Sequence, residues 1–222
     1  EACAARLIGG GATVTLWDRD AKGLKDAQAR LGRGVNGVQV DVSDEHSVAQ
    51  AVKATLAFGA SIDILVNSAG ITGPNVTVID YPVDEWNRVF DINVRGTFLT
   101  CRAIAPVMKQ ANQGKGYGRI VNIASVVAVA GQPGYLHYVA TKRAVLAMTK
   151  ALAKECGNIN VRVNVIAPGF VITDATKNRP VEWQQSFLKA RALSREQRPQ
   201  DLVGTAVYLL SEMAGFVSGQ TI

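Results

Sequence analysis

The sequence predicts an α/β protein in which a doubly wound parallel sheet carries helices on both faces. Strand-like and helix-like segments alternate along the 222 residues. The strand-like segments are rich in β-branched residues, and the run Ile62–Val66 is almost continuously apolar, as expected for a strand buried on both faces. No linker, repeat or low-complexity segment interrupts this alternation, so we expect a single domain over residues 1–222.

Each expected strand is a short apolar run that ends at a polar or small residue. Strands are expected at 12–17, 38–40, 62–66, 119–123 and 161–166. The segments between them have helical character, and helices are expected at 21–32, 44–58, 84–92, 96–112, 137–156 and 200–213.

The two ends of the sequence fall inside the expected pattern. The segment 1–8 resembles a helix that no strand precedes, and 219–222 resembles the start of another strand. A doubly wound sheet without its first strand would have a gap at its centre. We therefore expect that strand to lie upstream of residue 1.

The composition excludes several classes of protein. With 48% hydrophobic residues the chain can bury a core, and no apolar run approaches the roughly 18 residues of a membrane span. The net charge of +6 fits a small anionic ligand better than nucleic acid, because no long basic run occurs and aromatic residues make up only 6%. Three scattered cysteines argue against a disulfide framework or a metal site and favour a cytoplasmic location.

Candidate reactive side chains follow the ends of the expected strands. Tyr138 and Lys142 are four residues apart and share one face of a helix. Ser125 comes directly after the strand at 119–123, at the edge of a parallel sheet where ligands bind. The stretch Asn67-Ser-Ala-Gly70 follows the strand at 62–66, and its small residues allow close approach of a ligand.

Two further stretches complete the pattern. Asn93 lies at an expected break between helices, and Pro168-Gly169-Phe-Val-Ile-Thr173 follows the strand at 161–166. Together these motifs resemble the short-chain dehydrogenase/reductase family, in its compact single-domain branch, over the whole of residues 1–222. The resemblance implies a Rossmann-type fold, and it places the family's glycine-rich phosphate loop immediately before Glu1.

The resemblance implies that Asn93, Ser125, Tyr138 and Lys142 are catalytic. Tyr138 would be the general acid/base in the interconversion of a secondary alcohol and a ketone, and Ser125 would hydrogen-bond the substrate oxygen. A free tyrosine has a pKa of about 10, so a nearby cation is needed to favour the phenolate, and Lys142 could supply it. Asn93 would hold a water molecule that links Lys142 to solvent.

The expected cofactor is NAD, with NADP as the less favoured alternative. Asp18 ends a strand, where a carboxylate accepts hydrogen bonds from the adenosine ribose and repels a 2′-phosphate, although the adjacent Arg19 could serve that phosphate. Tyr138 and Lys142 would also contact the cofactor. By resemblance the remaining cofactor-binding residues are Asp41, Val42, Asn67, Ala69, Gly70, Pro168, Gly169, Val171 and Thr173.

The substrate is expected to contact Ser125, Tyr138, His137 and Trp183. A lid is expected at 174–198. Six residues of its part 177–198 are basic and two are acidic, so we expect an anionic substrate held by Arg179, Arg191 or Arg195. A solvated basic surface is the alternative to this site.

Two other functions stay open on the sequence: an NADP-dependent 3-ketoacyl-type reductase and a non-catalytic dinucleotide-binding regulatory protein. The helices at 96–112 and 137–156 are apolar on nearly every side, which favours a dimer interface formed by them, and the family resemblance implies that the dimer is part of a homotetramer. No metal, nucleic acid or membrane partner is expected.

Overall fold

Parallel strands form the centre of the fold in the computed structural model, which describes residues 1–111, 117–174, 176–178 and 181–222. The strands are β1 (Val14–Asp18), β2 (Val35–Gln39), β3 (Ile64–Asn67), β4 (Arg119–Ile123) and β5 (Arg162–Ile166). Within the described ranges, β1 pairs with β2, and β3, β4 and β5 form a second sheet in that order. Every pairing is parallel, which confirms the predicted fold class.

The two sheets share a core although β1 and β3 are not hydrogen-bonded to each other. Trp17 of β1 packs against the cluster that contains Leu65 of β3. The end of the chain also joins this centre, because Thr221 forms a single parallel bridge with Val165 of β5. The strand expected at 219–222 is thus one bridge long in the described chain.

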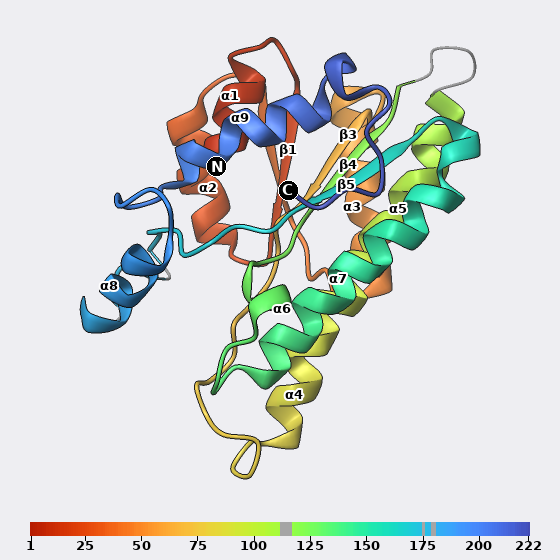
Figure 1. Cartoon of the computed structure of the whole chain (residues 1–222). Coiled ribbons are helices and arrows are strands. Elements are labelled where there is room, and N and C mark those ends of the chain that lie inside the picture. Colours follow the sequence, from red (N-terminus) through yellow and green to blue (C-terminus); the bar gives the residue numbers. More distant parts are fainter. Residues whose placement is uncertain (112–116, 175, 179–180) are drawn as a thin grey trace.

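Helices cover both sides of the strands (Figure 1). On one side, α1 (Ala2–Ile8) contacts α9 (Pro199–Leu210), and the Glu1–Arg30 ion pair ties α1 to α2 (Ala21–Leu31). On the other side lie α3 (Glu45–Gly59), α5 (Gly96–Ala111) and α7 (Leu136–Glu155). Short elements complete the described chain: α4 (Val83–Phe90), η1 (Asp91–Arg95), α6 (Val127–Ala130), η2 (Gly157–Ile159), α8 (Val181–Ala190) and η3 (Glu212–Ala214).

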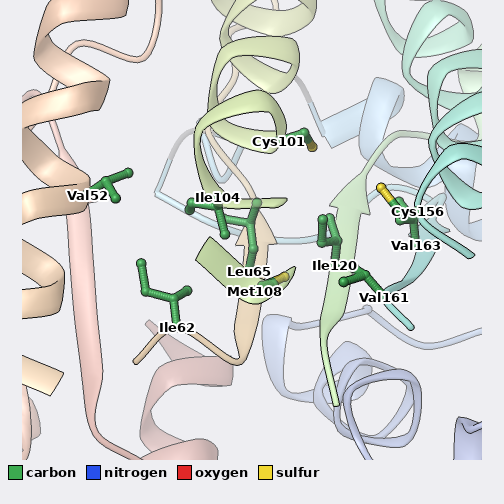
Figure 2. Packing of buried hydrophobic residues seen from close by; sticks show 10 residues of the cluster. All are labelled: Val52, Ile62, Leu65, Cys101, Ile104, Met108, Ile120, Cys156, Val161 and Val163. Atoms are coloured by element: carbon green, nitrogen blue, oxygen red, sulfur yellow. The ribbon is translucent and has the colours of Figure 1, made fainter. Parts of the chain in front are cut away.

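The largest core cluster fills the space between α3, α5 and the strands (Figure 2). Its central members are Ile104 and Met108 of α5, which lie against Leu65 of β3 and Ile120 of β4. The cluster also contains Val52, Ile62, Cys101, Cys156, Val161 and Val163. This packing anchors the strands whose carboxyl ends carry the predicted site.

The expected break between helices at Asn93 is a π-helical turn. α4, η1 and α5 follow one another directly, so the chain does not leave the helical path between Val83 and Ala111. The sequence predicts the existence of these helices but not the wider turn, because a π turn has no distinct composition. The β2 segment begins three residues earlier than the expected strand at 38–40.

Candidate active site

Lys142 is a buried cation at the centre of the predicted catalytic group. It lies on α7, only 5% exposed, and its Nζ donates a hydrogen bond of 2.8 Å to the backbone oxygen of Ile123 at the end of β4. Burial lowers its pKa to about 8. The ammonium lies 5.7 Å from the centre of the Tyr138 ring, so the two predicted partners are neighbours on the helix.

Tyr138 and Ser125 meet across the gap between α7 and the end of β4. Burial raises the pKa of the Tyr138 phenol, and a hydrogen-bonding interaction with the Ser125 side chain lowers it to a smaller extent. The net shift raises the pKa of Tyr138, whereas a nearby Lys142 ammonium alone would lower it. The physical reason is that desolvation of the phenol outweighs the polar neighbours, while the Lys142 ammonium donates to the carbonyl of Ile123.

Asn93 holds the loop after β3 in place from within the π-helical turn. Its Oδ1 accepts from the backbone nitrogen of Ile71 at 2.8 Å, and its Nδ2 donates to the Ile71 oxygen at 2.9 Å and to Thr141 Oγ1 at 3.0 Å. The side chain is 1% exposed. Its amide therefore clamps a loop to α7, and within the described chain these three bonds engage both its donor and its acceptor.

Gly70 brings the loop close to the catalytic group. A Cβ atom at this position would lie 3.1 Å from Asn93 Oδ1 and 3.3 Å from Lys142 Nζ. Gly70 and Ala69 are exposed, so their backbone is accessible to a ligand. The predicted residues Asn93, Gly70 and Lys142 thus come together although they are far apart in the sequence.

The side chain of Asn67 is engaged in contacts within the protein. Its Nδ2 donates to Asn122 Oδ1 at 2.9 Å, and its Oδ1 accepts from Thr100 Oγ1 at 2.8 Å. Asn122 in turn donates to Thr149 Oγ1 of α7 at 2.9 Å. Asn67 therefore has its backbone available for a ligand, and its side chain links β3 to β4 and to α5.

The predicted adenosine site lies at the carboxyl ends of β1 and β2. Asp18 is exposed at the end of β1, and its Oδ1 accepts from the backbone nitrogen of Asp20 at 3.0 Å. Hydrogen bonds from the hydroxyl and backbone nitrogen of Ser43 lower the pKa of Asp41. Val42 lies against α5, where a Cβ on Gly96 would be 2.8 Å from its Cγ2.

The segment after β5 is joined to the Ser125 loop. Pro168 accepts a hydrogen bond of 2.9 Å from the backbone nitrogen of Val126, and Gly169 beside it is exposed. The hydroxyl of Thr173 lies 3.1 Å from that of Thr176, which donates to the Val171 oxygen at 2.7 Å. Pro168 therefore lies beside the Ser125 loop, and Val171 and Thr173 follow it in a segment held by Thr176.

The residues predicted to contact substrate separate into two groups. Ser125 and Tyr138 lie at the sheet edge, whereas the ring of His137 is fully buried against the loop after β3. The backbone of Trp183 belongs to α8, and its side chain is outside the described residues. The expected lid is closed at its base by a backbone bridge between Val171 and Gln197.

The basic residues of the expected lid mostly contact the protein itself. Arg195 forms an ion pair of 2.7 Å with Asp201, and Arg191 donates to the backbone oxygen of Phe170 at 2.9 Å. Lys177 pairs with Asp174 at 2.6 Å. Arg179 lies outside the described residues. These contacts reduce the positive charge that the described lid presents to a ligand.

Sequence reasoning missed Thr141, a fully buried residue between two predicted catalytic ones. Its hydroxyl accepts from Asn93 and donates to the Tyr138 backbone oxygen at 2.9 Å. The signal was present, because Thr141 follows Tyr138 by three residues and therefore shares its helix face. In the described part of the chain no three metal-binding side chains gather, and none of the helices found there could span a membrane.

Comparison with known proteins identifies the family. The family model described as enoyl-(acyl carrier protein) reductase matches residues 1–222. The chain belongs to the short-chain dehydrogenase/reductase family. It is 34% identical to the 3-oxoacyl-(acyl-carrier-protein) reductase of Chlamydia muridarum over 216 residues, which cover 96% of this chain and 85% of the relative.

Other members of this family give closely similar structures and different activities. The chain is 36% identical to an NAD(+)-dependent 2-dehydro-3-deoxy-L-rhamnonate dehydrogenase of a Sphingomonas species, over 98% of this chain and 86% of the relative. The NAD+-bound xylitol dehydrogenase structure matches with a TM-score of 0.92 and 30% identity, covering 100% of this chain and 91% of that one. A Brucella melitensis 3-ketoacyl-(acyl-carrier-protein) reductase with NADH matches at 0.93 and 32%, covering 100% and 89%. The chain is an NAD(P)-dependent oxidoreductase.

Proposed function

We propose that this protein is an NAD-dependent oxidoreductase that interconverts a secondary alcohol and a ketone. The observation that carries the proposal is the joint placement of Ser125, Tyr138 and Lys142 beside the exposed backbone at Gly70. The family supports hydride transfer, and this cluster supplies the acid/base chemistry that hydride transfer to or from a carbonyl requires.

In this proposal Tyr138 removes the hydroxyl proton of the alcohol or returns it to the carbonyl. Ser125 donates a hydrogen bond to the substrate oxygen and stabilises charge that develops there. When bound, the nicotinamide supplies the hydride acceptor, and in its oxidised form it adds positive charge near the site. Because burial raises the pKa of Tyr138, the phenol depends on added positive charge to act as a base at neutral pH.

The residues at the sheet edge fit a dinucleotide. Lys142 is buried with one described acceptor, the Ile123 oxygen, so its remaining N–H groups are suited to ribose hydroxyls. The missing side chain of Gly70 leaves backbone accessible next to that ammonium. Asp41, Val42, Pro168, Gly169, Val171 and Thr173 would line the remainder of the cofactor site, with Ala69 and the backbone of Asn67.

Asp18 favours NAD over NADP in this proposal. Its exposed carboxylate at the end of β1 would accept hydrogen bonds from ribose hydroxyls and repel a 2′-phosphate. Two relatives whose names or structures specify NAD, the rhamnonate and xylitol dehydrogenases, are consistent with this choice. The second candidate is an NADP-dependent 3-ketoacyl-type reductase, in which Arg19 would face the phosphate; the names of the 3-oxoacyl relatives support its ketoacyl reaction.

The deciding experiment follows the absorbance of reduced nicotinamide with both dinucleotides and a panel of substrates. Secondary alcohols, sugar acids and a 3-ketoacyl thioester should be tested in the direction each permits. Turnover of alcohols with NAD at higher kcat/KM than with NADP would support the first candidate, and thioester reduction with NADPH would support the second. A protein that binds dinucleotide and turns over no member of the panel would be the non-catalytic regulatory alternative.

The charge of the substrate is a finer proposal that rests on the basic segment at 177–198. Arg191 and Arg195 already contact Phe170 and Asp201, so an anion would have to displace or share those contacts. If an anion binds there, its KM should rise with salt and rise again in Arg191→Gln, while a matched neutral alcohol should respond to neither. If salt and Arg191→Gln change the KM of both substrates equally, the segment 177–198 is a solvated basic surface and does not bind an anion.

We further propose a cytoplasmic homotetramer. The location is supported by the free thiols of Cys3, Cys101 and Cys156, two of which are buried. The assembly is supported by exposed apolar side chains on the two helices named for it, including Phe98 of α5 at 47% and Leu136 of α7 at 48%.

A further inference from the structure

His137 is a fully buried histidine with an incomplete set of hydrogen bonds. Its side chain is 0% exposed, and its Nε2 lies 2.6 Å from the backbone oxygen of Thr72. A carbonyl oxygen only accepts, so Nε2 must carry the proton and donate it. In the neutral ring Nδ1 then holds a lone pair, and this atom is buried without a described partner.

The ring is held tightly on its other sides. Tyr81 packs over it with ring centres 4.3 Å apart and an interplanar angle of 33°. Gly73 adopts φ +67°, and a Cβ there would lie 2.5 Å from His137 Nε2. The loop between β3 and α4 is therefore shaped to receive this side chain, and only glycine allows that approach at residue 73.

The position of His137 on α7 gives this contact its significance. Tyr138 is the third residue of α7 and lies in the first turn, which the N-cap residue Tyr135 does not cap with its side chain. The first backbone N–H groups of a helix lack partners within it, so an uncapped first turn frays readily. The proposed general acid/base therefore belongs to a segment that needs support from outside the helix.

Two contacts supply that support, one on each side of Tyr138. His137 bonds Thr72 of the loop, and Thr141 donates to the Tyr138 backbone oxygen while accepting from Asn93. Asn93 bonds both backbone groups of Ile71, the residue before Thr72. Loop, π-helical turn and first turn of α7 thus form one closed set of hydrogen bonds.

We propose that His137 is a positioning residue for Tyr138. The Nε2–H of His137 bonds the backbone oxygen of Thr72 and thereby holds the first turn of α7 against the 71–81 loop. The inference rests on the proposed role of Tyr138 and replaces the expected substrate contact of His137. His137 acts in its neutral form, since burial lowers its pKa. The ionisable groups around it are Tyr81 on the loop, the Glu85–Arg88 pair on α4, and Tyr135 and Tyr138 beside it on α7.

The test uses two replacements of His137 that differ in one property. His137→Gln keeps a donor that can reach Thr72, whereas His137→Phe keeps the ring on Tyr81 and removes the donor. Tyr81→Phe is the matched control, because the Tyr81 hydroxyl is buried without a described partner. Each folded variant is examined by hydrogen exchange of the amides at 71–81 and 136–139 and by the pH dependence of kcat.

We expect His137→Phe to lower kcat by about three- to tenfold, the value of one hydrogen bond, with KM nearly unchanged. The increase of kcat with pH should also occur at higher pH than in the parent. Hydrogen exchange should become faster at both 71–81 and 136–139. His137→Gln should restore most of kcat and the parental profile, and Tyr81→Phe should match the parent in every measurement.

Parental exchange rates and pH profile in His137→Phe would overturn the inference, as would equal impairment of the Gln and Phe variants. Failure of the proposed function gives a different result, because parent protein without turnover on any substrate would leave the exchange measurements to decide the role of His137. Exchange that speeds up in the Phe variant alone would then still support the contact, and unchanged exchange would refute it.

Discussion

Tyr138 is a half-buried phenol whose pKa is raised by its surroundings, so its proposed role depends on one ionisable oxygen. Replacing Tyr138 by Phe keeps the ring packed and removes that oxygen. We expect turnover to fall below about 1% of the parent, within the range contributed by general acid/base catalysis, and dinucleotide affinity to change by only a few-fold. Steady-state kinetics and a fluorescence titration measure the two effects. Substantial residual turnover would identify a different base.

Lys142 costs the folded chain stability because its ammonium is desolvated. Its pKa is about 8 in the folded chain against an ordinary value of 10.5, so between these values the unfolded chain holds a proton that the folded chain does not. The free energy of unfolding should therefore rise with pH across this window. Below pH 8 both states are protonated and the full cost, on the order of 3 kcal/mol, is present.

Lys142→Met should remove this cost and leave the Ile123 oxygen without its donor, at about 1–3 kcal/mol. We expect the variant to be inactive, to bind dinucleotide more weakly and to be roughly 1–2 kcal/mol more stable at pH 7. Urea denaturation at several pH values measures the difference, which should shrink as the pH approaches 10.5. A difference that does not change with pH would show that Lys142 keeps an ordinary pKa.

Asp18 should determine the choice between dinucleotides. Replacing Asp18 by Ala removes a charged acceptor worth about 1.5–3 kcal/mol, which corresponds to a ten- to hundred-fold loss of kcat/KM with NAD. Activity with NADP should fall less or rise, because the repulsion of the 2′-phosphate is also removed. Parallel kinetics with both dinucleotides check this. An unchanged ratio of the two kcat/KM values would place Asp18 away from the ribose.

At the scale of elements, the start of α5 and the loop at Val42 are fitted to each other. A Cβ at Gly96 would lie 2.8 Å from Val42 Cγ2 and 3.4 Å from the Val42 oxygen. Gly96→Ala should therefore displace the loop, lower stability by about 1–3 kcal/mol and raise the KM for the dinucleotide more than it lowers kcat. Thermal unfolding and kinetics measure these effects.

Gly204 in α9 provides the control for this prediction. Among the described residues, no atom outside the backbone of α9 itself and the two neighbouring residues lies within 4 Å of a Cβ built there, so Gly204→Ala should only add helix propensity and stabilise the chain by about 0.5–1 kcal/mol. If both variants raise the melting temperature equally, the contact between Gly96 and Val42 is not restrictive.

Most elements could be predicted from the sequence because apolar periodicity reports burial directly. The strand at 119–123 has the bounds of β4, and the expected helix at 137–156 differs from α7 by one residue at each end. The π-helical turn at Asp91–Arg95 could not be predicted, because a π turn has no distinct composition. The contacts of Asn93 with Ile71 and Thr141 could not be predicted either, because these residues are distant in sequence.

At the scale of the molecule, part of the apolar surface of α5 and α7 is already covered within one chain. Leu99, Ile104 and Met108 of α5 and Val145 and Leu146 of α7 are all buried within one chain. The layers of strands and helices cover more of these helices than the sequence pattern suggested.

Exposed apolar residues still favour self-association. We expect light scattering at micromolar concentration to give a mass above that of the 23.6 kDa monomer, and Phe98→Glu to lower it by placing a charge in the contact. Lys154→Glu, a change of charge in the last turn of α7, is the control. A monomeric parent would contradict the proposed assembly.

The sequence predicts those features of the site that the chemistry of a residue type determines. It does not predict pKa shifts or side-chain contacts that depend on packing. Ser125, Tyr138 and Lys142 meet as their spacing and strand positions indicated. The raised pKa of Tyr138 could not be predicted, because desolvation by the surrounding layers cannot be judged from neighbours in sequence. His137 faces the loop for the same reason: its environment is made by residues 72–81.

The amide pair of Asn67 and Asn122 has a consequence for assembly of the chain. These residues are register partners on β3 and β4, and their side chains bond each other as well as Thr100 and Thr149. A slip of β3 by two residues would bring Leu65 opposite Asn122. The buried amide of Asn122 would then lose its hydrogen-bond partner on β3, which is energetically costly. Folding intermediates in which β3 and β4 pair in another register are thereby disfavoured. The loops that follow Asn67 and Ile123 therefore begin at fixed positions relative to each other.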